Sequence, residues 1–230
     1  MVKIAILNLT DLPEDIGGGK HVGRTIREWL APAMPGDELT VIEVTAGAPI
    51  PQVGEYDGFV LSGSEKGVYD GMPWLGPLRD LLLEARAQSV PVFGICFAHQ
   101  FMAEVYGGKA ELAGLGEAVG VRRFEVDGQG VDVHVWHRDQ VTKVPPGARV
   151  LGGADYCPFG VLAYDFPAMS VQFHPEFTPA FLTHAIKKNA GKAQTPAETK
   201  ERLASVSSGD VPVDLMAKEA ARLLYGTSFN

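Results

Sequence analysis

The chain has little cysteine and no long hydrophobic run, and each absence excludes a class of protein. It contains two cysteines among 230 residues, Cys96 and Cys157, without CxxC spacing. A disulfide scaffold is therefore not expected, and a reducing compartment is predicted. No stretch approaches the roughly 18 apolar residues of a transmembrane helix, and the apolar run at residues 2–9 lacks the flanks of a signal peptide. We expect a cytoplasmic protein that does not bind membranes.

Positive charge is also scarce. The 20 Lys and Arg residues are outnumbered by 28 Asp and Glu residues, which gives a formal net charge of -8. Nucleic acids and anionic membranes bind clustered Lys and Arg, so neither is an expected partner. Because 46% of the residues are hydrophobic, the chain can bury a large core without disulfides or metals.

The first half of the chain alternates strand and helix patterns. Short apolar runs predict buried strands at residues 2–9, 39–44, 58–62 and 90–95. Helical spacing of apolar side chains predicts helices at residues 23–30 and 75–88. Strands that alternate with helices pair in parallel and form a sheet covered on both faces.

The second half has a different texture. Alternating patterns predict antiparallel strands at residues 117–126 and 130–136 around the turn signal Asp127-Gly128, and two further strands at residues 159–164 and 168–173. Helices are predicted at residues 178–188, 196–204 and 213–224, and the Ser-rich stretch 205–210 is the candidate for a mobile linker.

These patterns together predict an α/β fold. We expect a three-layer, doubly wound and mostly parallel sheet, with helices on both faces and some antiparallel strands in the second half. Residues 1–190 are expected to form this domain, and residues 191–230 a C-terminal helical extension packed on it.

The sharpest local feature is the segment Pro91-Val-Phe-Gly-Ile-Cys-Phe-Ala-His-Gln100. A buried strand ends at Cys96 and a helix begins immediately after it, which throws the apical side chain into solvent above the sheet and aims the helix N-terminus at whatever it attacks. Gly94 lets the helix cross close over the strand. On position alone a buried structural cysteine is an equal alternative.

A second segment decides between these alternatives. Val171-Gln-Phe-His-Pro-Glu-Phe177 places His174 at the end of another predicted strand. Because ligands gather at the carboxyl ends of parallel strands, Cys96 and His174 are expected at one edge of the sheet. Glu176 lies within reach of the other imidazole N–H, and together they predict a nucleophile–base–acid triad.

Other polar groups give weaker signals. His134 and His137 face opposite sides of a predicted strand, no Cys or carboxylate set completes a metal site, and no cofactor is expected. The segment at residues 17–20 (Gly-Gly-Gly-Lys) lacks the spacing of a phosphate loop and is expected to be a substrate-side loop or a helix lead-in. Asp139 is expected to cap a turn or pair with Arg138.

Apart from Cys96, the remaining thiol and the tryptophans are interpreted as packing groups. Cys157 is predicted to be a small buried hydrophobic side chain. Trp29, Trp74 and Trp136 are expected to pack in the core, and residues 69–74 are candidates for the mouth of the pocket.

The motifs together resemble the class I (triad) glutamine amidotransferase family. Gly94-Ile-Cys-Phe-Ala-His-Gln100 is similar to its cysteine motif, and His174-Pro-Glu176 to its histidine-glutamate motif. Val60-Leu-Ser-Gly-Ser64 resembles the segment that supplies an oxyanion-hole N–H. His137-Arg-Asp-Gln-Val141 resembles a segment of the subgroup that includes the glutaminase half of GMP synthase and stand-alone γ-glutamyl peptidases. The resemblance covers roughly residues 1–190.

The resemblance implies a chemistry. Cys96 would attack the γ-amide of glutamine or of a γ-glutamyl compound, with His174 as base and Glu176 orienting it. The backbone N–H groups of Gly63 and Phe97 would hold the oxyanion. Gln100 would shape the acyl pocket, and Ser64 and Glu65 are weaker candidates for contacts with this small-molecule substrate.

One residue departs from the family pattern. The family usually has Gly two residues after the cysteine, where this chain has Ala98, whose methyl group could crowd the oxyanion hole or the helix–strand contact. Because alanine is small and favours helix, we expect the elbow to persist.

Three functions remain open. The chain could be a glutaminase that passes ammonia to a synthetase on another chain, since it carries no acceptor-site motif of its own. It could be a self-sufficient γ-glutamyl peptidase without ammonia channelling. It could also be a non-catalytic binding or regulatory relative, for which Ala98 is the hint. The C-terminal helices could cover the sheet, pack on a second copy in a homo-oligomer or contact a synthetase.

Overall fold

A computed structural model describes residues 1–12, 16, 21–114, 116–192, 194–212 and 214–226. Its main feature is a nine-stranded sheet in the order β2-β1-β3-β4-β11-β10-β9-β6-β7. The first five strands in that order pair in parallel: β2 (Glu38–Glu43), β1 (Lys3–Asn8), β3 (Gly58–Leu61), β4 (Val92–Ile95) and β11 (Ala168–Val171).

The other four strands continue the same sheet in antiparallel pairs. They are β10 (Cys157–Ala163), β9 (Arg149–Ala154), β6 (Ala118–Val126) and β7 (Gln129–His137). The β6–β7 hairpin closes through Asp127 and Gly128, both with positive φ (50° and 74°), as the turn signal predicted. A separate two-stranded ladder pairs β5 (Lys109–Leu112) with β8 (Asp139–Lys143).

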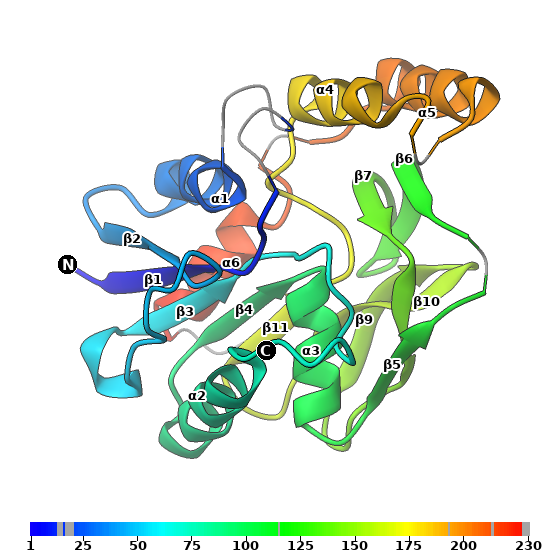
Figure 1. The fold of residues 1–230 in the computed structure, drawn as a ribbon. Coiled ribbons are helices and arrows are strands. Elements are labelled where there is room, and N and C mark those ends of the chain that lie inside the picture. The colour runs from blue at the N-terminus through cyan, green and yellow to red at the C-terminus, as the bar shows by residue number, and fades with distance from the viewer. Residues whose placement is uncertain (13–15, 17–20, 115, 193, 213, 227–230) are drawn as a thin grey trace.

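Helices cover both faces of the parallel half (Figure 1). They are α1 (Val22–Leu30), α2 (Leu75–Gln88), α3 (Phe97–Val105), α4 (Pro179–Asn189), α5 (Pro196–Ser208) and α6 (Ala217–Leu224), with short 3-10 helices at η2 (Ala31–Ala33) and η3 (Val53–Glu55). Successive residues of β1 point into different cores: Ile4 and Ile6 pack with α1 and α6, whereas Ala5 and Leu7 pack with α2 and α3. The predicted three-layer α/β fold is confirmed.

The C-terminal segment contacts the rest of the chain on two sides. Helix α5 lies beside α4 and against β6, and α6 packs on β4 beside α1 (Figure 1). The Trp29 indole of α1 donates a hydrogen bond to Leu215 O at 3.2 Å. The tail therefore supplies side chains to the same core as the N-terminal half.

The predicted linker at residues 205–210 is wrong in its first part, because α5 continues through Ser208 and Val206 is buried. The serines are tolerated since Ser207 and Ser208 donate hydrogen bonds back to Leu203 O and Ala204 O within the helix. Strands β5, β8 and β9 were not predicted, and α6 begins at Ala217 rather than at residue 213, which lies outside the described residues.

Candidate active site

Cys96 occupies the turn between β4 and α3 in an unusual backbone conformation. Its φ of 52° and ψ of -103° place a non-glycine residue in a sparsely populated region, which costs about 1–3 kcal/mol. Hydrogen bonds on both sides hold it there: Cys96 N donates to Val171 O at 2.8 Å, and Cys96 O accepts from Gln100 N at 3.2 Å. Hydrogen bonds to the neighbouring strand and to the helix thus hold the strained elbow that the sequence predicted.

The helix crosses close over β4 because Gly94 has no side chain. A Cβ on Gly94 would lie 2.5 Å from Met102 Sδ and 3.3 Å from the carbonyl carbon of Ala98. The same position would lie 3.4 Å from the Ala98 methyl group. The sequence suggested that the Ala98 methyl group could crowd either the oxyanion hole or the helix–strand contact. In the structure it lies at the helix–strand contact.

His174 follows β11 and pairs with Glu176. Its Nδ1 lies 2.8 Å from Glu176 Oε1, and both residues are buried. Its backbone N–H donates to His134 O at 2.8 Å, which ties this loop to β7. Burial alone would lower the pKa of His174, but the charge of Glu176 and the interaction with Cys96 outweigh it and raise that pKa to about 10.

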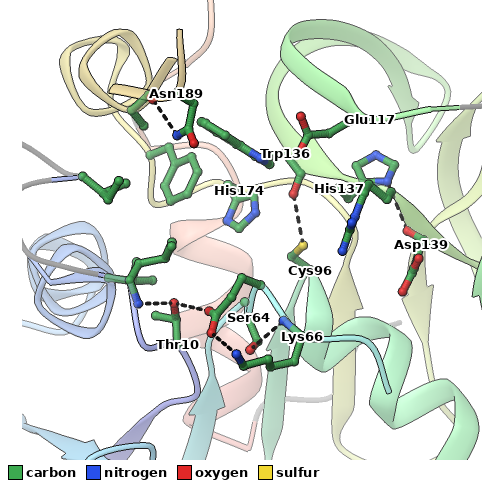
Figure 2. A pocket seen from close by; sticks show the side chains of 18 of the residues that line it. Thr10, Ser64, Lys66, Cys96, Glu117, Trp136, His137, Asp139, His174 and Asn189 are labelled. Carbon is green, nitrogen blue, oxygen red and sulfur yellow. Dashed lines mark hydrogen bonds and ion pairs between the residues drawn. The ribbon is translucent and has the colours of Figure 1, made fainter. Parts of the chain in front are cut away.

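The sequence suggested that the elbow would place the Cys96 side chain in solvent. This expectation is wrong, because the residue is only 4% exposed. The thiol lies 3.6 Å from Trp136 O, to which it donates, and accepts from Gln172 Nε2 at 3.6 Å. Figure 2 shows the sulfur and the His174 imidazole facing the same cavity. The thiol is therefore covered by Trp136 of β7 and by Gln172, which follows β11, and strand-by-strand reasoning did not reveal these contacts.

Gly63 closes the third side of this group. A Cβ on Gly63 would lie 2.9 Å from His174 Cε1 and 3.4 Å from Cys96 Cβ, so a side chain there would displace the histidine or the cysteine. Ser62 fixes the loop, since its Oγ accepts from Leu9 N and donates to Gly63 O, both at 2.8 Å. Sequence reasoning missed Ser62, although it stands inside the Val60-Leu-Ser-Gly-Ser64 motif.

The cavity has a volume of about 270 Å³, and Cys96 and His174 both line it. Its polar and charged lining includes Ser64, Glu65, Lys66, Gln100, His137, Arg138 and Asp139. Its apolar lining includes Leu12, Ile16, Val22, Phe177, Phe181 and Ala185. The predicted contact residues Gln100 and Ser64 are therefore at the cavity, whereas residues 69–74 are not among its lining. Residues 17–20 lie outside the described residues.

Gln100 and Ser64 are held by the protein itself. The Gln100 side-chain amide donates to Asp139 O at 2.8 Å and to Gln172 Oε1 at 3.2 Å. Ser64 Oγ accepts from Lys66 N at 3.3 Å. Gln100 therefore joins three segments of the cavity wall.

Asp139 was expected to cap a turn or to pair with Arg138, and among the described residues its side chain does neither. Its Oδ2 instead accepts a hydrogen bond from Tyr69 OH at 3.0 Å. The adjacent His137 stacks on Tyr156, with ring centroids 5.8 Å apart, and burial lowers the pKa of His137 to about 4. His137 is therefore neutral near pH 7 and presents an uncharged ring to the cavity.

Cys157 and the three tryptophans were all predicted to be packing residues, and one of the tryptophans also lines the cavity. Cys157 is buried, as expected, and burial raises its pKa to about 12. Trp29 and Trp74 pack against the two cores. Trp136 also lines the cavity, which the packing interpretation missed, and its indole donates to Glu117 Oε1 at 3.0 Å. In the described ranges no group of three or more His, Cys, Asp or Glu side chains is arranged to hold a metal ion.

A strained cysteine at a strand–helix turn, next to a buried His–Glu pair at the carboxyl edge of a doubly wound sheet, defines an α/β protein with a nucleophile elbow. The family model described as glutamine amidotransferase class-I matches residues 27–192. The chain belongs to this family, and the resemblance inferred from the motifs is confirmed.

The chain is similar both to glutamine-hydrolyzing GMP synthases and to γ-glutamyl peptidases. The chain is 36% identical over 147 residues to "GMP synthase [glutamine-hydrolyzing]" of Azoarcus sp. (strain BH72), covering 56% of this chain and 26% of that protein. It is 33% identical over 165 residues to a protein of Archaeoglobus fulgidus named as one subunit of the glutamine-hydrolyzing GMP synthase, covering 67% and 81%. It is 27% identical over 146 residues to "Gamma-glutamyl peptidase 2" of Arabidopsis thaliana, covering 58% and 59%.

The aligned regions are therefore about a quarter of the bacterial synthase and somewhat over half of the plant peptidase. Among solved structures, a glutamine amidotransferase from Thermotoga maritima matches with a TM-score of 0.74 at 20% identity, covering 97% of this chain and 96% of that chain. The similarity in fold thus extends over the C-terminal helices, beyond the region that the family model matches. No helix in the described part of the chain is both long and apolar enough to span a membrane.

Proposed function

We propose that this chain is a cysteine amidohydrolase that cleaves the γ-amide of glutamine or of another γ-glutamyl compound through a thioester on Cys96. The observation that carries the proposal is the 2.8 Å pairing of His174 with Glu176 in the same cavity wall as a cysteine held at a φ of 52°. A base oriented by a carboxylate next to a conformationally fixed nucleophile is the arrangement that acyl transfer requires.

The proposed reaction has two halves. In the first, the Cys96 thiolate attacks the γ-carbonyl carbon, and His174 gives a proton to the departing amine as the C–N bond breaks. In the second, water attacks the thioester and gives a proton to His174, and the C–S bond breaks. Glutamate is released, and the Cys96 thiolate and the protonated His174 are restored. Glu176 stabilises the imidazolium, and the direction of the His174 pKa shift supports this role.

We assign the oxyanion to the backbone N–H groups of Gly63 and Phe97. Phe97 is the first residue of α3, where N–H groups have no partner within the helix. Gly63 lies beside the two reacting residues, since a Cβ on it would lie 2.9 Å from His174 Cε1 and 3.4 Å from Cys96 Cβ. Each such donor contributes about 3 kcal/mol to transition-state stabilisation. Gln100 and Ser64 are proposed to shape and contact the acyl pocket.

A second candidate function is supply of ammonia to a synthetase on a separate chain. It is favoured by the similarity to the Archaeoglobus fulgidus protein, whose name makes it one part of a GMP synthase. In that case glutamine is the substrate, and the partner chain would use the ammonia.

The test is to incubate the purified protein with glutamine and with γ-glutamyl amides, and to measure glutamate release with Cys96→Ser as the control. Cys96-dependent glutamate release supports the proposal. A protein that releases no glutamate, and whose Cys96 is not alkylated by an electrophilic glutamine analogue, contradicts it and favours a non-catalytic binding role.

A further inference from the structure

The cavity wall differs in chemical character from one side of Cys96 to another. Figure 2 shows His137 and Asp139 on one side of the cysteine, His174 with Asn189 on the opposite side, and the polar Thr10, Ser64 and Lys66 on a third. The side of His137 carries hydrogen-bonding and charged groups, including Arg138. A γ-glutamyl group ends in an ammonium and a carboxylate, so its charged head fits this polar side and its acyl carbon then lies at Cys96.

The side of His174 is walled by aromatic rings. The Phe177 ring stacks on the His174 imidazole with centroids 4.0 Å apart and an interplanar angle of 6°. Phe181 stacks in turn on Phe177, with centroids 4.4 Å apart and an angle of 30°. Val22 and Ala185 also line the cavity and belong to the same buried hydrophobic cluster as Phe177 and Phe181.

The group that leaves must depart on the His174 side, because His174 protonates its nitrogen. Any substituent on that nitrogen therefore meets the wall formed by Phe177, Phe181, Val22 and Ala185. Ammonia has no substituent and would leave this wall without a contact. A built apolar wall next to the acid that protonates the leaving group is a binding site for that group.

We infer that these four residues form a leaving-group subsite for the apolar amine portion of a γ-glutamyl amide. The inference rests on the proposed function and names its substrate class: γ-glutamyl compounds whose amine carries an alkyl or aryl group, in preference to glutamine. Water is the acyl acceptor, so glutamate and the free apolar amine are the products.

The first experiment needs no variant. The purified protein is given glutamine and the γ-glutamyl amides of methylamine, butylamine, benzylamine and 3-hydroxypropylamine, and kcat/KM is measured by glutamate release. Each added methylene should raise kcat/KM by about 2- to 4-fold, the factor for burying one methylene group. The butylamide should also exceed the 3-hydroxypropylamide, which matches it in size, by about 10-fold, because the side chains of these four residues offer the hydroxyl no partner to replace water. Asn189, which also lines the cavity, uses its amide N–H to donate to Ala185 O at 3.0 Å.

A second experiment places the effect at the wall. Phe181→Ala should reduce the ratio of butylamide to methylamide turnover by about 10-fold, and Phe181→Leu should reduce it less. Leu83→Ala removes an exposed apolar side chain from α2, away from the cavity, and should leave the ratio unchanged.

The outcomes distinguish failure of the leaving-group subsite from failure of the proposed function. Equal turnover of the butylamide and 3-hydroxypropylamide, or a series that falls with size while glutamine is hydrolysed, overturns the subsite and leaves the proposed function intact. A ratio that Phe181→Ala does not change also overturns the subsite. No Cys96-dependent turnover of any donor overturns both.

Discussion

Arg202 of α5 and Glu117, next to β6, form an ion pair with Arg202 Nη1 3.1 Å from Glu117 Oε2. The other oxygen of Glu117 accepts from the Trp136 indole, and the Trp136 carbonyl accepts from the Cys96 thiol. A helix that lies beyond the family's matched region is thereby connected to the proposed nucleophile through Arg202, Glu117 and Trp136, the last by its backbone carbonyl. We interpret Arg202 as a positioning residue.

Arg202→Met should destabilise the protein and reduce its activity. The Arg202 side chain is 9% exposed, and the loss of one partner of a largely buried pair leaves a carboxylate uncompensated. We expect a loss of about 1–3 kcal/mol in the free energy of unfolding, measured with urea, and a fall in kcat with a smaller change in KM. Arg123→Met is the matched control, because the Arg123 side chain is 67% exposed in its pair with Asp132 and should cost less than about 1 kcal/mol. Equal losses in the two variants would contradict the positioning role.

Removing residues 191–230 should prevent folding, since we propose that these residues belong to the same folding unit as residues 1–190. The truncation deletes the buried Leu223 and Leu224 of α6, each worth about 1.5–3 kcal/mol, from a protein whose total stability is expected to be about 5–15 kcal/mol. The control is a chain ending at residue 226, which keeps these contacts and should unfold cooperatively in urea. Cooperative unfolding of residues 1–190 alone would show that the tail is a separate appendage.

The order of strands and helices in the parallel half followed from local patterns, because continuous apolar runs and helical spacing are set by burial on both faces of the sheet. Helix α2 has the predicted bounds. Strand β9 was not predicted because Gly152 and Gly153 interrupt its apolar pattern. Strand β5 was not predicted because it is four residues long and begins with a charged residue. Pairing across the fold, rather than local propensity, makes these segments strands.

In the site, too, some residues could be predicted from the sequence and others could not. Cys96 and His174 each follow a predicted strand, so the topology of a parallel sheet was enough to expect them at one edge, whereas Gly63 was expected at the site from the family resemblance. The Tyr69–Asp139 and Arg202–Glu117 pairs join residues 70 and 85 positions apart with no local pattern. Contacts between residues so far apart leave no periodic pattern in a single sequence. The Arg202–Glu117 pair was therefore not predicted, and Asp139 was assigned other partners.

Cys96→Gly should be more stable than Cys96→Ala, the reverse of the order inside a helix. Glycine adopts a φ of 52° with ψ of -103° without the steric cost that alanine keeps. We expect a difference of about 1 kcal/mol in the free energy of unfolding, with both variants inactive. Gly76 of α2 provides the comparison, because Gly76→Ala should stabilise the protein there. If alanine is favoured at both positions, the elbow is not strained.

Gly63→Ala should disable the site while leaving the fold intact. The new methyl group would lie 2.9 Å from His174 Cε1, so the imidazole must move away from Cys96. We expect kcat/KM for glutamate release to fall by about 100-fold, as when catalytic geometry is lost by about 1 Å. Gly76→Ala meets nothing within 4 Å and should keep full activity. An active Gly63→Ala enzyme would mean that the His174 position is not critical.

Glu176→Gln should shift the alkaline limb of the pH profile toward lower pH. In the native protein the pKa of His174 is raised to about 10, so its proton is available to the leaving amine up to about that pH and is lost above it. The amide removes the charge that raises this pKa, and burial, which lowers it, then dominates. The alkaline limb of kcat/KM should therefore fall well below pH 10, and the maximal rate should drop by about 100-fold or more, because the imidazole loses its orienting carboxylate.

Folding is linked to the same proton. Because the pKa of His174 is raised in the folded protein, the stability that its protonated form contributes is complete below its ordinary pKa of 6.5 and is lost as pH rises toward 10. Urea unfolding of the native protein and of Glu176→Gln across pH 6 to 10 should therefore show a decline that is steeper in the native protein. Identical kinetic limbs and identical stability profiles would mean that Glu176 does not set the protonation of His174.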